Sequence, residues 1–185
     1  GLLLTVTDKD GIKPNKTINT AVGFVVKILR SIPFIILLVA VMPITRAIIG
    51  TTIGSSATIV PLVIAAAPYI ARMVESSVKE VDRGVVEASH SMGASTLQIV
   101  WKVLIPEAKP SLLLGAAISI TTILSYSAMA GFVGGGGLGD IAIRYGYNLG
   151  KTDIMLVMVV VLVVIVQVFQ AFGAWISSKN DKRIR

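Results

Sequence analysis

The 185-residue chain contains no cysteine and only one histidine, His90. Without cysteine there is no disulfide, no thiolate nucleophile and no cysteine-based metal site, and a single histidine argues against a histidine-rich metal centre or a Ser-His triad. Charged residues are also scarce, at 15% of the sequence. The side chains that usually carry enzymatic chemistry are therefore in short supply, which points away from a catalytic role.

Apolar residues, in contrast, are abundant. They make up 54% of the sequence, and the mean hydropathy is +0.83, well above that of an ordinary globular domain. A helix needs about 20 mostly apolar residues to cross a hydrocarbon core. Four segments qualify or come close, namely 32–49, 57–74, 111–133 and 154–176. The sequence therefore predicts an all-α, polytopic transmembrane helical bundle.

The basic residues are unevenly distributed between these segments. Residues 5–30 and 72–109 carry five each and the tail after Ile176 carries four, whereas Arg46, Arg144 and Lys151 are the remaining three. Because Lys and Arg are enriched in cytoplasmic loops, we expect the first three regions to face the cytoplasm. Membrane topology thus accounts for the net charge of +7, and no nucleic-acid partner is expected.

The third and fourth predicted spans differ in character. The third carries pairs of small residues at helical spacing, Gly115 with Ser119 and Ser127 with Gly131, which allow another backbone to approach closely. The fourth, 154–176, is almost uniformly apolar. We expect the third span to lie inside the bundle and the fourth to face lipid.

A polar stretch between the second and third spans predicts a helix break followed by a new helix. Gly93 and Ala94 end one helix, and Ser95 through Gln98 fit the S-x-x-Q capping box, in which the Ser and Gln side chains satisfy free backbone N–H groups.

Apolar residues then recur at i, i+3, i+4 and i+7, which predicts a short amphipathic helix that Pro106 ends. They are Leu97, Val100, Trp101 and Leu104. By composition alone this helix could rest among lipid headgroups or dock on a partner protein.

The residues around this helix favour the second alternative. Glu87, Ala88 and Ser89 are followed at fixed spacing by Gly93 and by a Val-Leu-Ile-Pro sequence ending at Pro106. This spacing resembles the EAA motif of ABC importer permeases, E-A-A-x3-G-x9-I-x-L-P. The departures are mild, with Ser89 at the third small position and similar aliphatic residues exchanged before Pro106.

The resemblance covers nearly the whole chain. RSIPFIILL at 30–38, APYIARMVE at 67–75 and YSAMAGFVGGGGLGDIAIRYGY at 126–147 are similar to the permeases of methionine importers. Those permeases have a five-helix core, one helix more than is visible here, so we expect a first helix lost before Gly1. A cleaved signal peptide is the alternative, but neither a charged n-region nor a cleavage site is visible.

The resemblance also implies a domain organisation and a set of coupling residues. Residues 1–185 would form a single transmembrane permease domain, with a cytoplasmic coupling loop at 75–109 that inserts into a cleft on an ATPase. The implied ATPase-coupling residues are Glu87, Ala88, Ser89, Gly93, Ala94, Ser95, Leu97, Val100, Trp101, Leu104 and Pro106.

The implied function is import of methionine, in its L and D forms, across the bacterial cytoplasmic (inner) membrane by alternating access. The implied partners are a second copy of the chain, two cytoplasmic ATPase subunits, an extracytoplasmic substrate-binding protein and membrane lipid. ATP and Mg²⁺ would be bound by the ATPase, because no Walker A sequence is present here. No catalytic residue, cofactor or metal is expected in this chain.

Polar residues on the third predicted span mark a possible pathway. They are Ser119, Thr122, Ser125 and Tyr126, followed one turn later by Met129. Hydrogen bonding between helices, and core packing for the methionine, are the alternatives. The family resemblance favours a translocation pathway with Met129 as its gate.

Gly134, Gly136 and Gly139 match G-x-G-x-x-G but close a membrane span instead of a soluble strand, so we interpret them as a close-packed outer turn in contact with the binding protein. Two other functions remain open. One is import of a different amino acid or small polar solute. The other is ion-coupled secondary transport, which would require ionisable groups at mid-membrane, whereas all ten acidic residues lie in loops or at span ends.

Overall fold

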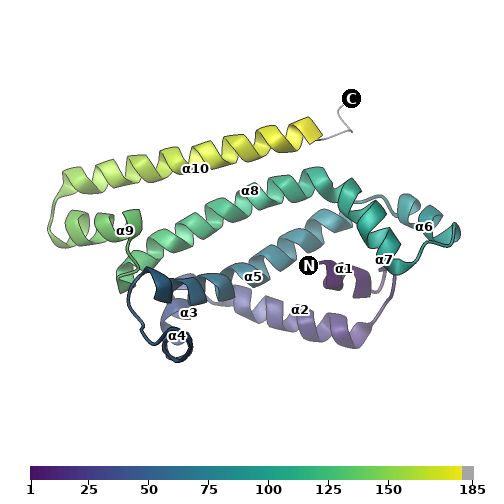
Figure 1. Ribbon diagram of the computed structural model, residues 1–185, viewed down its shortest axis with the longest axis horizontal. Helices are drawn as coiled ribbons and strands as arrows, with labels where there is room; N and C mark the ends of the chain where they lie inside the picture. Colours follow the sequence, from purple (N-terminus) through teal and green to yellow (C-terminus); the bar gives the residue numbers. More distant parts are fainter. Residues whose placement is uncertain (181–185) are drawn as a thin grey trace. The chain divides into compact units, whose positions relative to one another are not determined.

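The computed structural model describes residues 1–180, which contain helices and no strand (Figure 1). The predicted all-α class is therefore confirmed for this part of the chain. Three of the four basic residues of the predicted cytoplasmic tail, Lys182, Arg183 and Arg185, lie outside it. The elements are α1 (Leu2–Thr7), α2 (Lys16–Ser31), α3 (Phe34–Ala40), α4 (Met42–Ile49), α5 (Ser55–Lys79), α6 (Arg83–Ser91), α7 (Thr96–Ile99), the π-helix η1 (Val100–Leu104), α8 (Ile105–Met129), the 3₁₀ helix η2 (Ala130–Val133), α9 (Gly137–Ile141), the π-helix η3 (Ala142–Asn148) and α10 (Thr152–Asn180).

Within residues 1–180, three helical stretches are long and apolar enough to cross a membrane: Ser55–Lys79, Thr96–Val133 and Thr152–Lys179. They contain the predicted spans 57–74, 111–133 and 154–176, which are thereby confirmed. The most apolar part of α10 has a mean hydropathy of 2.9 and none of it is buried within the chain. This exposure agrees with the prediction that the last helix faces lipid.

The first predicted span, 32–49, is wrong as a single helix. The structure divides it at Val41 into α3 and α4, and it places α2 in residues that were predicted to be a loop. α2 and α3 are together long and apolar enough to cross a membrane, but their axes meet at an angle of 103°. Pro33 explains the bend, because proline lacks an N–H and disfavours helical geometry at the residue before it. Lys27 and Arg30 consequently belong to a helix.

The prediction that Pro106 ends the amphipathic helix is also wrong. Pro106 is the second residue of α8, within a helical stretch that runs from Thr96 to Val133. In a regular α-helix its ring would collide with the carbonyl four residues earlier. Here the five residues directly before α8 form the π-helix η1, whose wider turn accommodates the ring.

The chain forms two compact units, each with its own small core. The first unit comprises residues 1–28, 68–118 and the chain from Phe172 onward. Its core consists of Val78, Val81, Ile99, Val100, Leu104 and Ala108. The second unit comprises residues 29–67 and 119–171. Its core consists of Phe34, Leu38 and Ala130.

Glycine allows close helix packing within each unit, as the small-residue pattern predicted. In the first unit, a Cβ added to Gly115 of α8 would collide with the Met73 side chain of α5. In the second unit, a Cβ on Gly131 would lie 2.5 Å from the backbone nitrogen of Asp140. Glycine is required at position 131, where the neighbouring atoms are backbone, whereas at position 115 a larger residue would have to displace the flexible Met73 side chain.

Candidate functional site

The turn after α6 has the geometry that the sequence predicts around Gly93. Gly93 has φ +80°, a conformation that glycine adopts without strain. Its N–H donates to the His90 carbonyl over 2.9 Å, and the Ala94 N–H donates to the Ser89 carbonyl over 3.2 Å. These two bonds form a Schellman motif, which satisfies carbonyls at the end of α6 and turns the chain sharply.

The helix that follows begins with the predicted capping box. The Ser95 N–H donates to Gln98 Oε1 over 2.8 Å, and the Gln98 N–H donates to Ser95 Oγ over 3.4 Å. Because both free N–H groups are satisfied locally, the start of α7 is defined by its own sequence. The helix break and restart are therefore confirmed.

The predicted apolar stripe is split between two faces. Ile99 is completely buried (0% exposed), and Val100 and Leu104 also enter the core of the first unit. Leu97 and Trp101, in contrast, are 71% and 65% exposed. η1 changes the helical register after Ile99, so residues that an ideal α-helix would align separate into an inner and an outer group.

The other residues predicted to couple to an ATPase precede and follow this two-faced helix in the chain. Glu87 and Ala88 are exposed on α6, and the half-buried Ser89 donates its hydroxyl to the Val85 carbonyl over 2.8 Å. Ala94 packs against the first unit's core, whereas Pro106 is exposed.

Sequence reasoning did not identify two neighbours of this helix. Ile99 anchors its inner face, and Met92, at 84% exposure, adds an apolar side chain beside Gly93. Met92 occupies the C-cap of α6, a position that could have been read from the predicted helix end.

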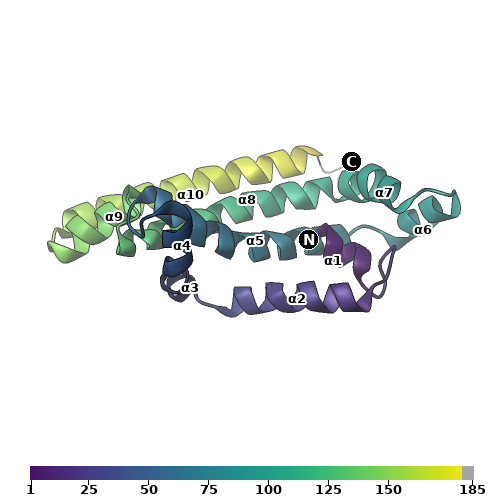
Figure 2. The ribbon, with the colours of Figure 1, turned by 60° about the horizontal axis from the view of Figure 1, so that its bottom comes forward.

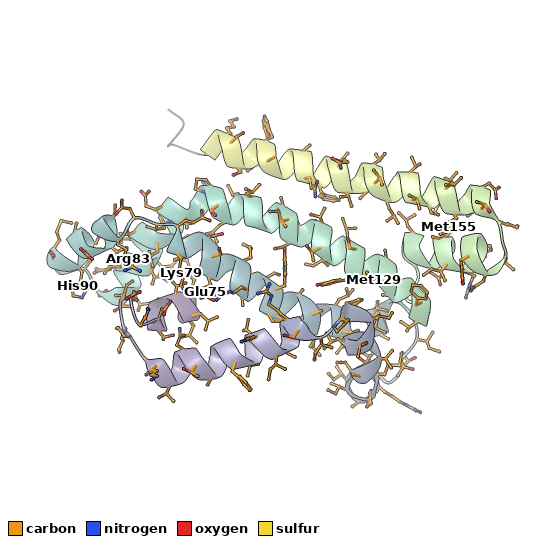
Figure 3. All side chains as sticks on the ribbon, turned by 180° about the vertical axis from the view of Figure 1, so that it is seen from behind. Glu75, Lys79, Arg83, His90, Met129 and Met155 are labelled. Atoms are coloured by element: carbon orange, nitrogen blue, oxygen red, sulfur yellow. The ribbon has the colours of Figure 1, made fainter. Side chains whose placement is uncertain are left out.

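Charged residues at the end of α5 and the start of α6 find partners within the chain (Figure 3). Glu75 is buried and lies 2.7 Å from Arg72 and 2.9 Å from Lys79. Lys79 also contacts Asp8 at 2.5 Å. The hydrogen bond with Lys79 holds the pKa of Asp8 below its ordinary value, so this carboxylate is ionised at neutral pH. Among residues 1–180 no three His, Asp or Glu side chains cluster as a metal site.

The five predicted pathway residues do not share one environment. The Tyr126 ring stacks on Phe34 with centroids 4.6 Å apart and joins the edge of the second unit's core. Ser125 and Met129 instead line a cavity of about 460 Å³, together with Gln167 of α10. Ser119 is buried, and Thr122 is half-buried. The Ser125 hydroxyl donates to the Thr121 carbonyl over 3.1 Å, so its donor is satisfied within α8.

The glycine-rich turn after α8 is a close-packed turn, as predicted. Gly134 and Gly136 have φ of +73° and +75°, and a Cβ on Gly135 would lie 2.7 Å from the Ala130 carbonyl oxygen. The turn folds α9 back against the end of α8. No phosphate-binding geometry is needed to explain these glycines.

Comparison with known proteins places this architecture in a family. The family model described as binding-protein-dependent transport system inner membrane component matches residues 1–185. The probable D-methionine transport system permease protein MetI of Vibrio cholerae is 54% identical over 157 residues, covering 85% of this chain and 70% of that protein. The methionine import system permease protein MetP of Bacillus subtilis is 42% identical over 181 residues, covering 98% and 82%.

A solved structure gives the same result for the fold. Inward-facing MetNI methionine ABC transporter contains a chain with a TM-score of 0.96 and 48% identity, covering 98% of this chain and 84% of that chain. Sequence and fold agree over almost the full length. The chain is therefore a multi-pass membrane protein that belongs to the family of binding-protein-dependent transport system inner membrane components, the permease subunits of ABC importers.

Proposed function

We propose that this chain is the membrane-spanning subunit of an ATP-driven importer that moves methionine, in both L and D forms, by alternating access. The observation that carries the proposal is the two-faced helix after Gly93. Its inner face is part of the first unit's core, and its outer face presents Leu97 and Trp101 to solvent. Such a helix suits the docking of a cytoplasmic ATPase.

The exposed side chains favour a protein partner. Leaving a large apolar side chain in water forgoes about 1.5–3 kcal/mol that burial would provide, and Leu97, Trp101 and Met92 all lie within ten residues of one another. An ATPase cleft would bury them, as an apolar helix face is buried in other groove complexes.

The inner face explains how docking would reach the membrane. Ile99 and Leu104 pack with Val78 near the end of α5 and with Val81 in the turn that follows it, and η1 continues directly into α8. A displacement of the docked helix would therefore move α8, which follows it in the chain, and the end of α5, against which its inner face packs. ATP and Mg²⁺ belong to the partner ATPase in this scheme, and two copies of the chain would pair with two ATPase subunits.

The relatives support the substrate. Two proteins with substantial identity over most of this chain are named for transport of D-methionine or import of methionine. In the second unit, Met129 and Ser125 border the cavity of about 460 Å³, so an apolar thioether lies where a passage could be closed. We assign the gate to Met129 and the outer glycine turn to contact with an extracytoplasmic binding protein.

The test is Leu97→Asp in the protein co-expressed with its ATPase. A carboxylate placed in an apolar cleft costs about 1–3 kcal/mol or more, so the affinity for the ATPase should fall about tenfold or more. Co-purification and methionine-stimulated ATP hydrolysis should fall with it. Leu149→Asp, the same change at another exposed leucine, is the matched control for co-purification.

Two outcomes separate the parts of the proposal. If Leu97→Asp co-purifies with the ATPase as well as the control does, the docking assignment is wrong. If the wild-type complex hydrolyses ATP but methionine neither stimulates hydrolysis nor enters vesicles, the substrate assignment is wrong while the docking assignment stands.

A further inference from the structure

The residues between α1 and α2, Asp8–Asn15, form a strap that is clamped to the coupling loop at two points. Asp8 contacts Lys79 at 2.5 Å, and Asp10 contacts Arg83 at 3.2 Å. Lys79 is the last residue of α5 and Arg83 is the first residue of α6. Lys79 and Arg83, both labelled in Figure 3, therefore lie on either side of the turn between α5 and α6.

The strap and the two helices that it joins form one hydrogen-bonded piece. The side-chain amide of Asn19 on α2 donates to the Leu4 carbonyl over 2.7 Å and to Thr7 Oγ1 over 3.2 Å. The Asn15 N–H donates to the Thr7 carbonyl over 3.0 Å. α1 thus lies beside the start of α2 and near the end of α5 (Figure 2). Motion of the strap would be transmitted to the start of α2.

Apolar contacts connect α1 and the strap to the two-faced helix after Gly93, the proposed docking helix. Leu2, Val6 and Ile12 pack against the first unit's core, which includes Ile99 and Leu104. Ile99 and Leu104 lie on the inner face of the docking helix, and its outer face carries Leu97 and Trp101. α1 and the strap therefore pack on the side of the docking helix opposite Leu97 and Trp101.

A cavity of about 510 Å³ separates part of the strap from α6, and it is lined by Asp10, Arg83, Val86, Glu87 and His90 among others. Its size would suit a small ligand. Four of its charged lining residues neutralise each other, as Asp8 with Lys79 and Asp10 with Arg83. The other two, Lys9 and Glu87, have opposite charges, so the lining carries no net charge that would select an ionic ligand. At this cavity the strap and α6 are joined by the Asp10–Arg83 ion pair.

We infer that the strap carries displacement of the coupling loop to α2, with Asp10 and Arg83 as positioning residues; the inference rests on the proposed function. α5 and α8 are continuous with the coupling loop along the chain, but α2 is not. The strap connects α2 directly to the coupling loop, so that α2 moves together with α5 and α8. Exposed ion pairs contribute little to the free energy of unfolding. In this inference they act by fixing the position of the strap against the coupling loop.

The experiment exchanges the two charges in the reconstituted importer, with ATPase and binding protein present. Asp10→Arg and Arg83→Asp each place like charges opposite one another, and we expect each to lower the methionine taken up per ATP hydrolysed about three- to tenfold. The double exchange restores the opposite charges and should return the ratio to within about twofold of wild type. Lys13→Asp is the matched control, because Lys13 lies in the same strap and forms no ion pair among residues 1–180.

A distance measurement distinguishes transmission from simple loss of structure. The chain contains no cysteine, so spin labels can be attached to Thr20→Cys on α2 and Ser91→Cys on α6 without background. In wild type the distance between the labels should be the same with and without ATP, whereas in Arg83→Asp it should change or broaden.

Failure of this inference is distinguishable from failure of the proposed function. If the wild-type complex shows no ATP-driven methionine uptake, the proposed function fails. If wild type couples normally but both single variants match it, or the double exchange fails to recover although it binds the ATPase, the strap does not position the coupling loop. A wild-type label distance that varies with nucleotide as much as that of Arg83→Asp also overturns it.

Discussion

At the scale of single residues, backbone contact determines the structure around the end of α8. A Cβ on Gly139 of α9 would lie 2.6 Å from the Ala128 Cα and still closer to the Ala128 carbonyl oxygen. Both are backbone atoms, which cannot move aside as a flexible side chain can. α9 is consequently held directly against the part of α8 that carries Met129.

We predict that Gly139→Ala destabilises the protein. Alanine would gain up to about 1 kcal/mol in helix propensity, but overpacking against fixed atoms costs about 1–3 kcal/mol, so the collision should dominate. The melting temperature in detergent should fall by several degrees. Gly23→Ala is the control, because a Cβ there meets only Leu4 at 3.9 Å; a Gly139→Ala protein as stable as this control would show that α9 can move away.

Residues whose interactions are local could be predicted from sequence, and those with distant partners could not. The Gly93 turn and the Ser95–Gln98 capping box are made by hydrogen bonds within six residues, so the spacing was sufficient. The burial of Val100 and Leu104 depends on Val78 and on α1, which no local pattern reveals. The split of the predicted stripe followed from that difference.

At the scale of helices, the π-helix η1 sets the direction in which Leu97 and Trp101, the side chains of the proposed docking face, are exposed. α8 contains two prolines near its start, Pro106 in its first turn and Pro110 one turn later, and Pro106 lies two residues after the end of η1. Each residue of an α-helix turns the chain by about 100°. If η1 reverted to α-helical geometry, Leu97 and Trp101 would rotate relative to α8.

We predict that Pro106→Ala weakens coupling without unfolding the protein. Alanine removes the ring that the π-helical turn accommodates, so η1 can relax towards the α-helical form and misdirect Leu97 and Trp101. Methionine-stimulated ATP hydrolysis should fall severalfold while the melting temperature stays within a few degrees of wild type. Pro110→Ala, one turn further along α8, should retain wild-type stimulation; equal losses in the two variants would mean that η1 does not direct the docking face.

The spans themselves show what hydropathy can and cannot predict. α5, α8 and α10 are long and uniformly apolar, so their existence follows from composition. α2 contains Lys16, Lys27 and Arg30, which interrupt the apolar pattern, and the 103° bend at Pro33 divides the remainder. The prediction of one straight helix over 32–49 therefore missed both α2 and the bend that precedes α3.

At the scale of the whole molecule, the distribution of basic residues and the proposed function predict the same orientation in the membrane. Under the proposed function the coupling loop faces the compartment that contains ATP, and the regions rich in Lys and Arg are expected to face the cytoplasm. Residues 72–109 satisfy both, because they contain five basic residues and the exposed Leu97 and Trp101. The opposite orientation would place the docking face outside the cell, where no ATPase could engage it.

This orientation predicts the side from which single cysteines can be labelled. The natural chain has no cysteine, so a membrane-impermeant maleimide reports only the position introduced. Asn15→Cys and Ser91→Cys, both exposed, should react only after the membrane is opened or inverted. Thr51→Cys and Asn148→Cys, also exposed, should react in intact cells, because an odd number of spans separates each of them from the coupling loop. Reaction of Ser91→Cys in intact cells would place the coupling loop outside and exclude a cytoplasmic ATPase as its partner, whereas reaction of Asn15→Cys alone would show that the bent pair α2 and α3 does not cross the membrane.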